Sequence, residues 1–150
     1  MSNLEVQYNI QDDIYYIKQK LSSGQTLAMY FECMHVSNTS VHWNIAMELY
    51  SKRNSANHNM ASKTLTGKNP LETFIFARKM FLQLQNVVLQ ENDDMERIIS
   101  CDWIDNRRRD AYYKVLHRYG YEYGTIFGEK VIFKKFPAGY WAAGHPAYTS

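Results

Sequence analysis

The chain has 150 residues, of which 45% are hydrophobic, 21% are charged and 15% are aromatic. This length fits one domain with a single packed core, and this composition excludes a disordered chain. A formal net charge of +2 is too small to indicate a nucleic acid partner by itself.

The cysteine content and the first residues indicate an intracellular protein. Cys33 and Cys101 lack the paired spacing of a metal site and the density of a disulfide scaffold, so we expect reduced thiols and no metal. The opening residues MSNLEVQYNIQDD have no basic start and no apolar core. No run approaches the ~18 apolar residues of a membrane span. We therefore expect neither export by a classical signal nor a membrane anchor.

The chain is predicted to begin with a strand and a short helix. Residues 4–10 alternate apolar and polar side chains, which is typical of a strand. The acidic residues 12 and 13 suit the first turn of a helix, and apolar residues at helical spacing extend it over residues 14–21. Residues 22–24 (Ser-Ser-Gly) then end the helix.

Two strands, a polar loop and a long helix are predicted next. Residues 26–35 and 41–50 are rich in strand formers and are expected to pair antiparallel. Residues 51–63 are polar and rich in Asn and Ser, which indicates a loop that ends in a brief strand. Asn69 as a cap and Pro70 at the first helical position then predict a long amphipathic helix.

The rest of the domain is predicted to form a strand, a helix and a hairpin. Residues 98–103 are apolar on both faces, which indicates a central strand. Helical spacing over residues 110–119 ends at Gly120, a residue suited to a left-handed cap. Two further strands flank Gly128. The predicted order β-α-β-β-(β)-α-β-α-β-β makes one α+β domain over residues 1–136.

This order, which ends in strand, Asn, helix, Arg-Tyr-Gly-Tyr and hairpin, resembles the GNAT superfamily of acyl-CoA N-acyltransferases. The resemblance covers most of residues 4–136, and residues 97–136 carry its specific part. It implies a central, mixed, mostly antiparallel sheet flanked by helices, whose fourth and fifth strands splay apart. It also implies that acetyl-CoA lies in that gap, with its pyrophosphate against the amino end of the long helix.

The resemblance places the pyrophosphate at residues 64–69, Thr-Leu-Thr-Gly-Lys-Asn. The family has Gln or Arg, two residues, Gly, one residue, and Gly or Ala at this place, whereas this chain keeps a single glycine. The candidate cofactor contacts are Thr66, Gly67, Lys68, Asn69 and, in the later turn, Asn106. Lys68 is alternatively a solvated side chain, and Asn106 alternatively caps the following helix.

The resemblance further implies a Tyr four residues before the helix-ending Gly, where it protonates the departing thiolate. Leu116 occupies that place here, so Tyr112 and Tyr113, one turn earlier, are the candidate acids. Both are alternatively packing residues between helix and sheet. The candidate general bases on the central strands are Glu32, His35, His42 and Glu48. Glu32 is the first choice because of its mid-strand position.

Two segments are candidate partner surfaces. Arg107, Arg108 and Arg109 are a phosphate contact, a nucleic acid patch or a solvated helix face that meets an acidic partner. The last reading is favoured because three consecutive residues cannot share one helical face. Residues 137–150 form an aromatic, Pro- and Gly-containing arm that either folds back or docks on another protein. We favour docking through its aromatic side chains, which are Tyr140, Trp141 and Tyr148.

Two hypotheses of function follow. A scaffold that keeps the fold but loses the phosphate loop and the acid Tyr resembles the degenerate GNAT-like proteins of tailed phages, notably small internal virion proteins of short-tailed phages. This resemblance implies a phage-encoded interaction protein in the virion or the host cytoplasm. The alternative is an active acetyl-CoA-dependent N-acyltransferase with an atypical loop, in which Tyr112 or Tyr113 is the acid.

Overall fold

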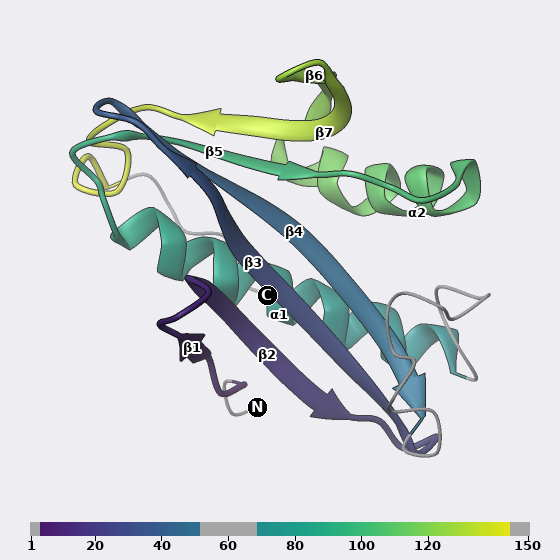
Figure 1. Cartoon of the computed structure of the whole chain (residues 1–150). Coiled ribbons are helices and arrows are strands. Elements are labelled where there is room, and N and C mark those ends of the chain that lie inside the picture. The colour runs from purple at the N-terminus through teal and green to yellow at the C-terminus, as the bar shows by residue number, and fades with distance from the viewer. Residues whose placement is uncertain (1–3, 52–68, 145–150) are drawn as a thin grey trace.

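The computed structural model describes residues 4–51 and 69–144 (Figure 1). Within these residues one seven-stranded sheet has the order β1-β2-β3-β4-β5-β7-β6, and all neighbours are antiparallel except β4 and β5. The elements are β1 (Gln7–Asn9), β2 (Ile14–Lys20), β3 (Gln25–Val36), β4 (Ser40–Ser51), α1 (Pro70–Gln90), β5 (Glu96–Cys101), α2 (Asn106–Leu116), a 3₁₀ turn (His117–Tyr119), β6 (Glu122–Ile126) and β7 (Glu129–Phe136). The predicted α+β fold with a mixed, mostly antiparallel sheet is confirmed.

The predicted first helix is wrong, because residues 14–20 form strand β2. The acidic residues build a turn instead of a helix start: Asn9 Oδ1 accepts hydrogen bonds from the N–H groups of Gln11 and Asp12, at 3.0 and 3.2 Å. Asp13 has a φ of 54°, in the left-handed region. This Asx turn reverses the chain, so β2 pairs with β1. β2 also pairs with β3, and its Ile17 side chain is buried in the core.

The long helix α1 begins as predicted. Asn69 Oδ1 accepts a hydrogen bond from the Glu72 N–H at 3.2 Å, and Pro70 occupies the first turn. The Glu72 carboxylate also accepts hydrogen bonds from the Ser22 N–H (3.0 Å) and hydroxyl (2.8 Å), which fixes the β2–β3 turn to the start of the helix. The buried stripe of α1 covers β2 and β3. Apart from residue 51, the predicted loop over residues 51–63, with the brief strand at its end, lies outside the described residues.

The second helix starts four residues earlier than predicted, and its cap differs. Asp105 is the cap, since its carboxylate accepts a hydrogen bond from the Arg108 N–H at 2.9 Å. The prediction that Asn106 caps this helix is therefore wrong, and Asn106 is the exposed first helical residue. Gly120 has a φ of 90° at the helix end, as predicted. The hairpin turn consists of Phe127 and Gly128, both with positive φ.

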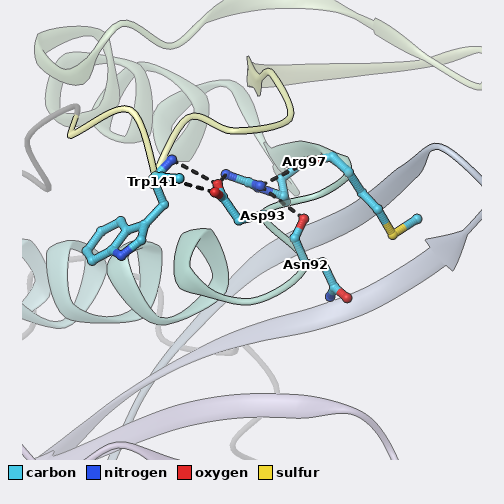
Figure 2. Close-up of polar contacts among 6 residues, drawn as sticks. Asn92, Asp93, Arg97 and Trp141 are labelled. Atoms are coloured by element: carbon cyan, nitrogen blue, oxygen red, sulfur yellow. Dashed lines mark hydrogen bonds and ion pairs between the residues drawn. The ribbon is translucent and has the colours of Figure 1, made fainter.

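The C-terminal arm folds back on the domain through residue 144. The Asp93 carboxylate accepts hydrogen bonds from the N–H groups of Trp141 and Ala142, at 2.8 and 3.0 Å (Figure 2). Tyr140 packs edge-on against Phe136, with ring centroids 5.0 Å apart. Tyr140 and Trp141 are thus partly buried within the chain, so the described part of the arm folds back, while docking of the arm on another protein stays a prediction. Tyr148 lies outside the described residues.

A buried arginine pairs with the carboxylate that holds this arm. Arg97, on β5, is 0% exposed, and its Nη1 donates to the carbonyl oxygens of Asn92 and Met95, both at 3.0 Å. Its Nη2 lies 3.0 Å from Asp93 Oδ1. Burial alone would raise the pKa of Asp93, but the two arm N–H groups and Arg97 outweigh burial and hold that pKa below its usual value. One carboxylate therefore ties the arm to the buried cation.

The parallel pair β4 and β5 positions the candidate site. The two strands pair from Ser40 and Glu96 as far as Ile45 and Cys101. β4 then continues to Ser51 with β3 as its described partner, whereas the chain leaves β5 after Cys101. Figure 1 shows the two strands side by side at one end and diverging toward the other. None of the described helices is both long enough and apolar enough to cross a membrane.

Candidate functional site

An apolar pocket lies where β4 and β5 diverge. Its volume is about 140 Å³. Its wall consists of residues from β3, β4, α1, the end of β5 and α2, which are Met29, Ile45, Ala46, Met47, Thr73, Phe74, Ala77, Phe81, Cys101, Asp102, Trp103, Ile104, Ala111, Tyr112, Val115 and Leu116. Among them, Ala46, Met47 and residues 102–104 come directly after the last β4–β5 pair, Ile45 and Cys101, so the pocket opens where the two strands diverge.

The mouth of the apolar pocket lies beside the start of α1. Phe74 and Ile104 line the pocket and are 39% and 65% exposed, whereas Met29 and Phe81 are buried at its inner end. Thr73, in the second turn of the capped helix start, also lines the pocket and donates its hydroxyl to the Asn69 carbonyl oxygen at 2.9 Å. The positive end of the α1 dipole is therefore close to the mouth.

Tyr112 contributes the one phenol to this wall. The side chain is 9% exposed, and its hydroxyl is buried without a hydrogen-bond partner among the described residues. Such a group is costly, because a buried polar atom without a partner has lost its hydration. Burial raises the pKa of Tyr112 above its usual value, so the phenol keeps its proton at neutral pH. The wall of the pocket thus includes a tyrosine whose phenol has no described hydrogen-bond acceptor.

Cys101 lines the same pocket but is a poor nucleophile. It is a free cysteine and is buried. Burial raises the pKa of its thiol, and the charge of Asp102 acts in the same direction. Because the thiolate is the reactive form of cysteine, this environment keeps Cys101 unreactive.

A second, polar pocket lies on the opposite face of the β4–β5 pair. Its volume is about 560 Å³, and it is lined by the end of β3, by β4 and β5 and by the β6–β7 turn, through Met34, His35, His42, Asn44, Ser100, Asp102, Ile126, Phe127, Glu129 and Val131. Alternate residues of a strand face opposite sides, so His42 and Asn44 face this pocket while Ile45 faces the apolar one. Asp102 lines both pockets.

A hydrogen-bonded trio forms the floor of the polar pocket. Ser100 Oγ lies 2.6 Å from His42 Nε2 and donates to Asn44 Oδ1 at 3.2 Å. With the serine proton directed to Asn44, the imidazole Nε2–H donates to Ser100, and Nδ1 carries the free lone pair. Nδ1 is buried and has no partner among the described residues. Burial and the nearby His35 lower the pKa of His42, so its imidazole is a neutral base at pH 7.

The lowered pKa of His42 predicts a specific loss of stability in mild acid. The unfolded chain takes up a proton at the usual histidine pKa of about 6.5, whereas the folded chain resists protonation. The stability is therefore complete above that pH and falls as the pH drops toward the lower folded-state pKa. Chemical denaturation between pH 7.5 and 5 should show a smaller loss for His42→Asn than for the wild-type chain. The same pH dependence of stability in both chains would contradict the lowered pKa of His42.

The structure brings some of the predicted catalytic residues together and separates others. Tyr112 lines the apolar pocket, and His35 and His42 line the polar one. Tyr113 lines neither, since its hydroxyl donates to Glu122 at 2.9 Å and its ring stacks on Tyr123 with centroids 4.2 Å apart. The hydrogen bond to Glu122 raises the pKa of Tyr113, with burial as a smaller cause.

The remaining predicted site residues line neither pocket or lie outside the described residues. Glu32 and Glu48 line neither pocket, and the Tyr30 hydroxyl donates to Glu48. Asn69 caps α1 and Asn106 starts α2, both of them exposed. Thr66, Gly67 and Lys68 lie outside the described residues. The described part of the chain contains no cluster of three or more His, Cys, Asp or Glu that could hold a metal ion.

Carboxylates pair with part of the positive charge of the arginine cluster. Arg108 is largely buried and pairs with Asp105 at 2.8 Å, and Arg109 pairs with Asp110 at 2.9 Å. Two of the three guanidinium groups therefore face carboxylates of their own helix, and Arg107 is exposed. The prediction that these side chains form a solvated helix face is wrong for Arg108. Contact of this cluster with nucleic acid stays a prediction.

Sequence reasoning missed Asn44, Ser100 and Asp102 as site residues. A signal was present, because His42 and Asn44 alternate along one strand and Ser100 and Asp102 alternate at the end of another. Polar side chains at every second position of two strong strands indicate a polar face in an otherwise apolar sheet. That signal becomes a site only when the strands are known to be neighbours, as the register of β4 and β5 shows.

Comparisons with protein-family models, with curated proteins and with solved structures found no match. The geometry of the two pockets therefore carries the functional argument.

Proposed function

We propose that this chain is an N-acyltransferase that binds the acyl group of an acyl-CoA in the apolar pocket. The observation that carries the proposal is the Tyr112 hydroxyl, buried without a described partner in an apolar wall where two parallel strands diverge. A group that pays this desolvation cost in the free protein is explained if a bound substrate accepts its hydrogen bond. The thiolate that leaves an acyl-CoA is such an acceptor.

The two pockets divide the work of acyl transfer to an amine. The acyl-CoA thioester supplies an activated acyl carbon, which the amine nitrogen attacks with loss of the thiolate. Tyr112, protonated at neutral pH, donates its proton to the departing sulfur from the apolar side. His42, neutral at the same pH, takes the proton that the amine nitrogen gives up on the polar side. One proton is donated and one is accepted, and exchange with solvent restores both groups.

The placement of charge supports an amine in the polar pocket. Asp102 and Glu129 both line it, and an ammonium group is favoured beside carboxylates. The bound ammonium group loses one proton to solvent before its nitrogen attacks, and His42 takes the second proton. Ser100 holds the His42 ring by the 2.6 Å contact at Nε2, which leaves Nδ1 as the nitrogen with the free lone pair. Since Asp102 lines both pockets, an amine beside it lies next to the apolar pocket that would hold the acyl group.

The family resemblance adds to this proposal. A GNAT protein is expected to hold acyl-CoA between diverging fourth and fifth strands, and β4 and β5 diverge here beside the start of a long capped helix. The dipole of that helix favours an anion such as the cofactor's pyrophosphate. The missing helix between the first two strands is a departure from the pattern that we expected.

Isothermal titration of the purified chain with acetyl-CoA and with free CoA tests the proposal. We expect micromolar binding of acetyl-CoA and weaker binding of CoA. Ala77→Trp places a large ring in the apolar pocket and should abolish the difference between the two ligands. The absence of any heat with either ligand, from a chain shown to be folded by its thermal melt, would contradict the proposal.

A protein-binding role, as a virion-associated or host-interacting protein, is the second candidate. The observation that favours it is a group of exposed apolar side chains beside the polar pocket, with Met34, Val36 and Phe127 being 54%, 58% and 76% exposed. Such side chains mark contact surfaces when they gather in one place. A photo-reactive cross-linker at position 127 should capture one partner in expressing cells that a cross-linker at Thr125 does not. Identical adducts at both positions would count against this role.

A further inference from the structure

We propose that the acyl group selected by the apolar pocket is a medium-length chain of about six carbon atoms, and not acetyl. This inference rests on the proposed function, because it names the substrate class of the same pocket. It is carried by the volume of the pocket, by the depth of its wall and by the chemistry of the residues at its inner end.

The volume is larger than an acetyl group requires. The pocket measures about 140 Å³. An apolar protein cavity of roughly 150 Å³ takes up a benzene molecule, which has six carbon atoms. An acetyl group has a single methyl beyond its carbonyl carbon, so it would leave most of the apolar wall without contacts. Unfilled apolar space forfeits dispersion contacts that a longer chain would make.

The wall of the apolar pocket extends to buried apolar residues of the core. Met29 from β3, Phe81 from α1 and Leu116 from α2 line the pocket and are 5%, 2% and 5% exposed. Leu116 stands where the family pattern has a tyrosine, and its side chain turns that position into hydrocarbon surface. The phenol of Tyr112 lies one helical turn away on the same face of α2. The thioester of a bound acyl-CoA would thus lie near Tyr112, and its acyl tail would lie against the apolar residues of the same pocket.

A chain-length series measures the selectivity directly. The 150-residue chain is titrated with acetyl-, butanoyl-, hexanoyl- and decanoyl-CoA, with free CoA as the reference. Each methylene buried in an apolar site tightens binding about fourfold, so hexanoyl-CoA should bind on the order of 100-fold more tightly than acetyl-CoA. Decanoyl-CoA should bind no more tightly than hexanoyl-CoA, because the additional carbons exceed the pocket.

A pair of matched substitutions separates the pocket from nonspecific binding of longer chains. Ala111 lines the pocket, and Ala111→Leu fills part of it with three more carbon atoms. This variant should weaken hexanoyl-CoA binding at least ~10-fold and change acetyl-CoA binding less than ~3-fold. Ala143 is exposed and lies outside the pocket, so Ala143→Leu should bind the whole series as the wild-type chain does.

The outcomes distinguish this inference from the function on which it rests. Tight hexanoyl-CoA binding that Ala111→Leu weakens supports the inference. Acetyl-CoA binding as tight as hexanoyl-CoA binding overturns the inference and leaves the acyltransferase proposal standing. A rise in affinity with chain length that Ala111→Leu and Ala143→Leu share also overturns it, because such binding would not involve the pocket. No detectable binding of any thioester overturns both the inference and the acyltransferase proposal.

Discussion

Replacement of Tyr112 by Phe is expected to stabilise the free protein while it disables the reaction. The Tyr112 hydroxyl is buried without a described partner, so its removal should raise the free energy of unfolding by about 1 kcal/mol. The same change removes the proton donor for the departing thiolate, which should lower kcat by about 100-fold or more. Acyl-CoA affinity should change little, because the ring still lines the pocket.

Urea denaturation measures the first effect, and release of free thiol from hexanoyl-CoA measures the second, with lysine and spermidine as acceptor amines. Tyr113→Phe is the matched control. Its hydroxyl donates to Glu122 outside both pockets, so this variant should gain no stability and should keep wild-type turnover. A Tyr112→Phe variant that is less stable than the wild-type chain and equally active would remove Tyr112 from the mechanism.

Replacement of Arg97 by Ala is expected to be the most destabilising single change in the domain outside the pockets. Arg97 is 0% exposed, and its guanidinium group satisfies two carbonyl oxygens and pairs with Asp93 (Figure 2). Truncation leaves a cavity and unpaired carbonyl groups, so the free energy of unfolding should fall by about 3 kcal/mol or more. The arm that Asp93 holds should loosen as well.

Two comparisons make the Arg97 prediction specific. Arg97→Met keeps most of the side-chain volume and should lie between Arg97→Ala and the wild-type chain in urea denaturation. Arg107→Ala removes an exposed arginine of α2 and should change the free energy of unfolding by less than about 0.5 kcal/mol. A loss below about 1 kcal/mol for Arg97→Ala would show that the buried guanidinium group contributes little.

The parts of the fold that local chemistry determines were predictable. Asn69 and Pro70 start α1, Gly120 ends the second helical segment with a φ of 90°, and Gly128 lies in the hairpin turn. The first helix was predicted wrongly because Ile14, Ile17 and Leu21 have helical spacing, although residues 14–20 form a strand. Pairing with β3 decides between helix and strand, and that pairing is a long-range property that spacing does not contain.

The candidate site was predictable only in part, because its residues are brought together by sheet register. Tyr112 was one of two candidate tyrosines, and only its burial in the apolar wall separates it from Tyr113. Glu32 was the favoured base, yet the parallel pairing of β4 with β5 brings the His42 side chain within hydrogen-bond distance of Ser100 instead. Asp93 and Trp141 are 48 residues apart, so the folding back of the arm has no local signal.

Methyl signals of the methionines offer the most direct test that the apolar pocket binds the acyl group. Met29 and Met47 line the apolar pocket and Met34 lines the polar one. In a chain labelled with ¹³C-methyl methionine, hexanoyl-CoA should shift the Met29 and Met47 signals and leave those of Met34 and Met95 in place. Free CoA should shift the Met29 and Met47 signals less than hexanoyl-CoA does. Unchanged Met29 and Met47 signals at saturating hexanoyl-CoA would contradict the account.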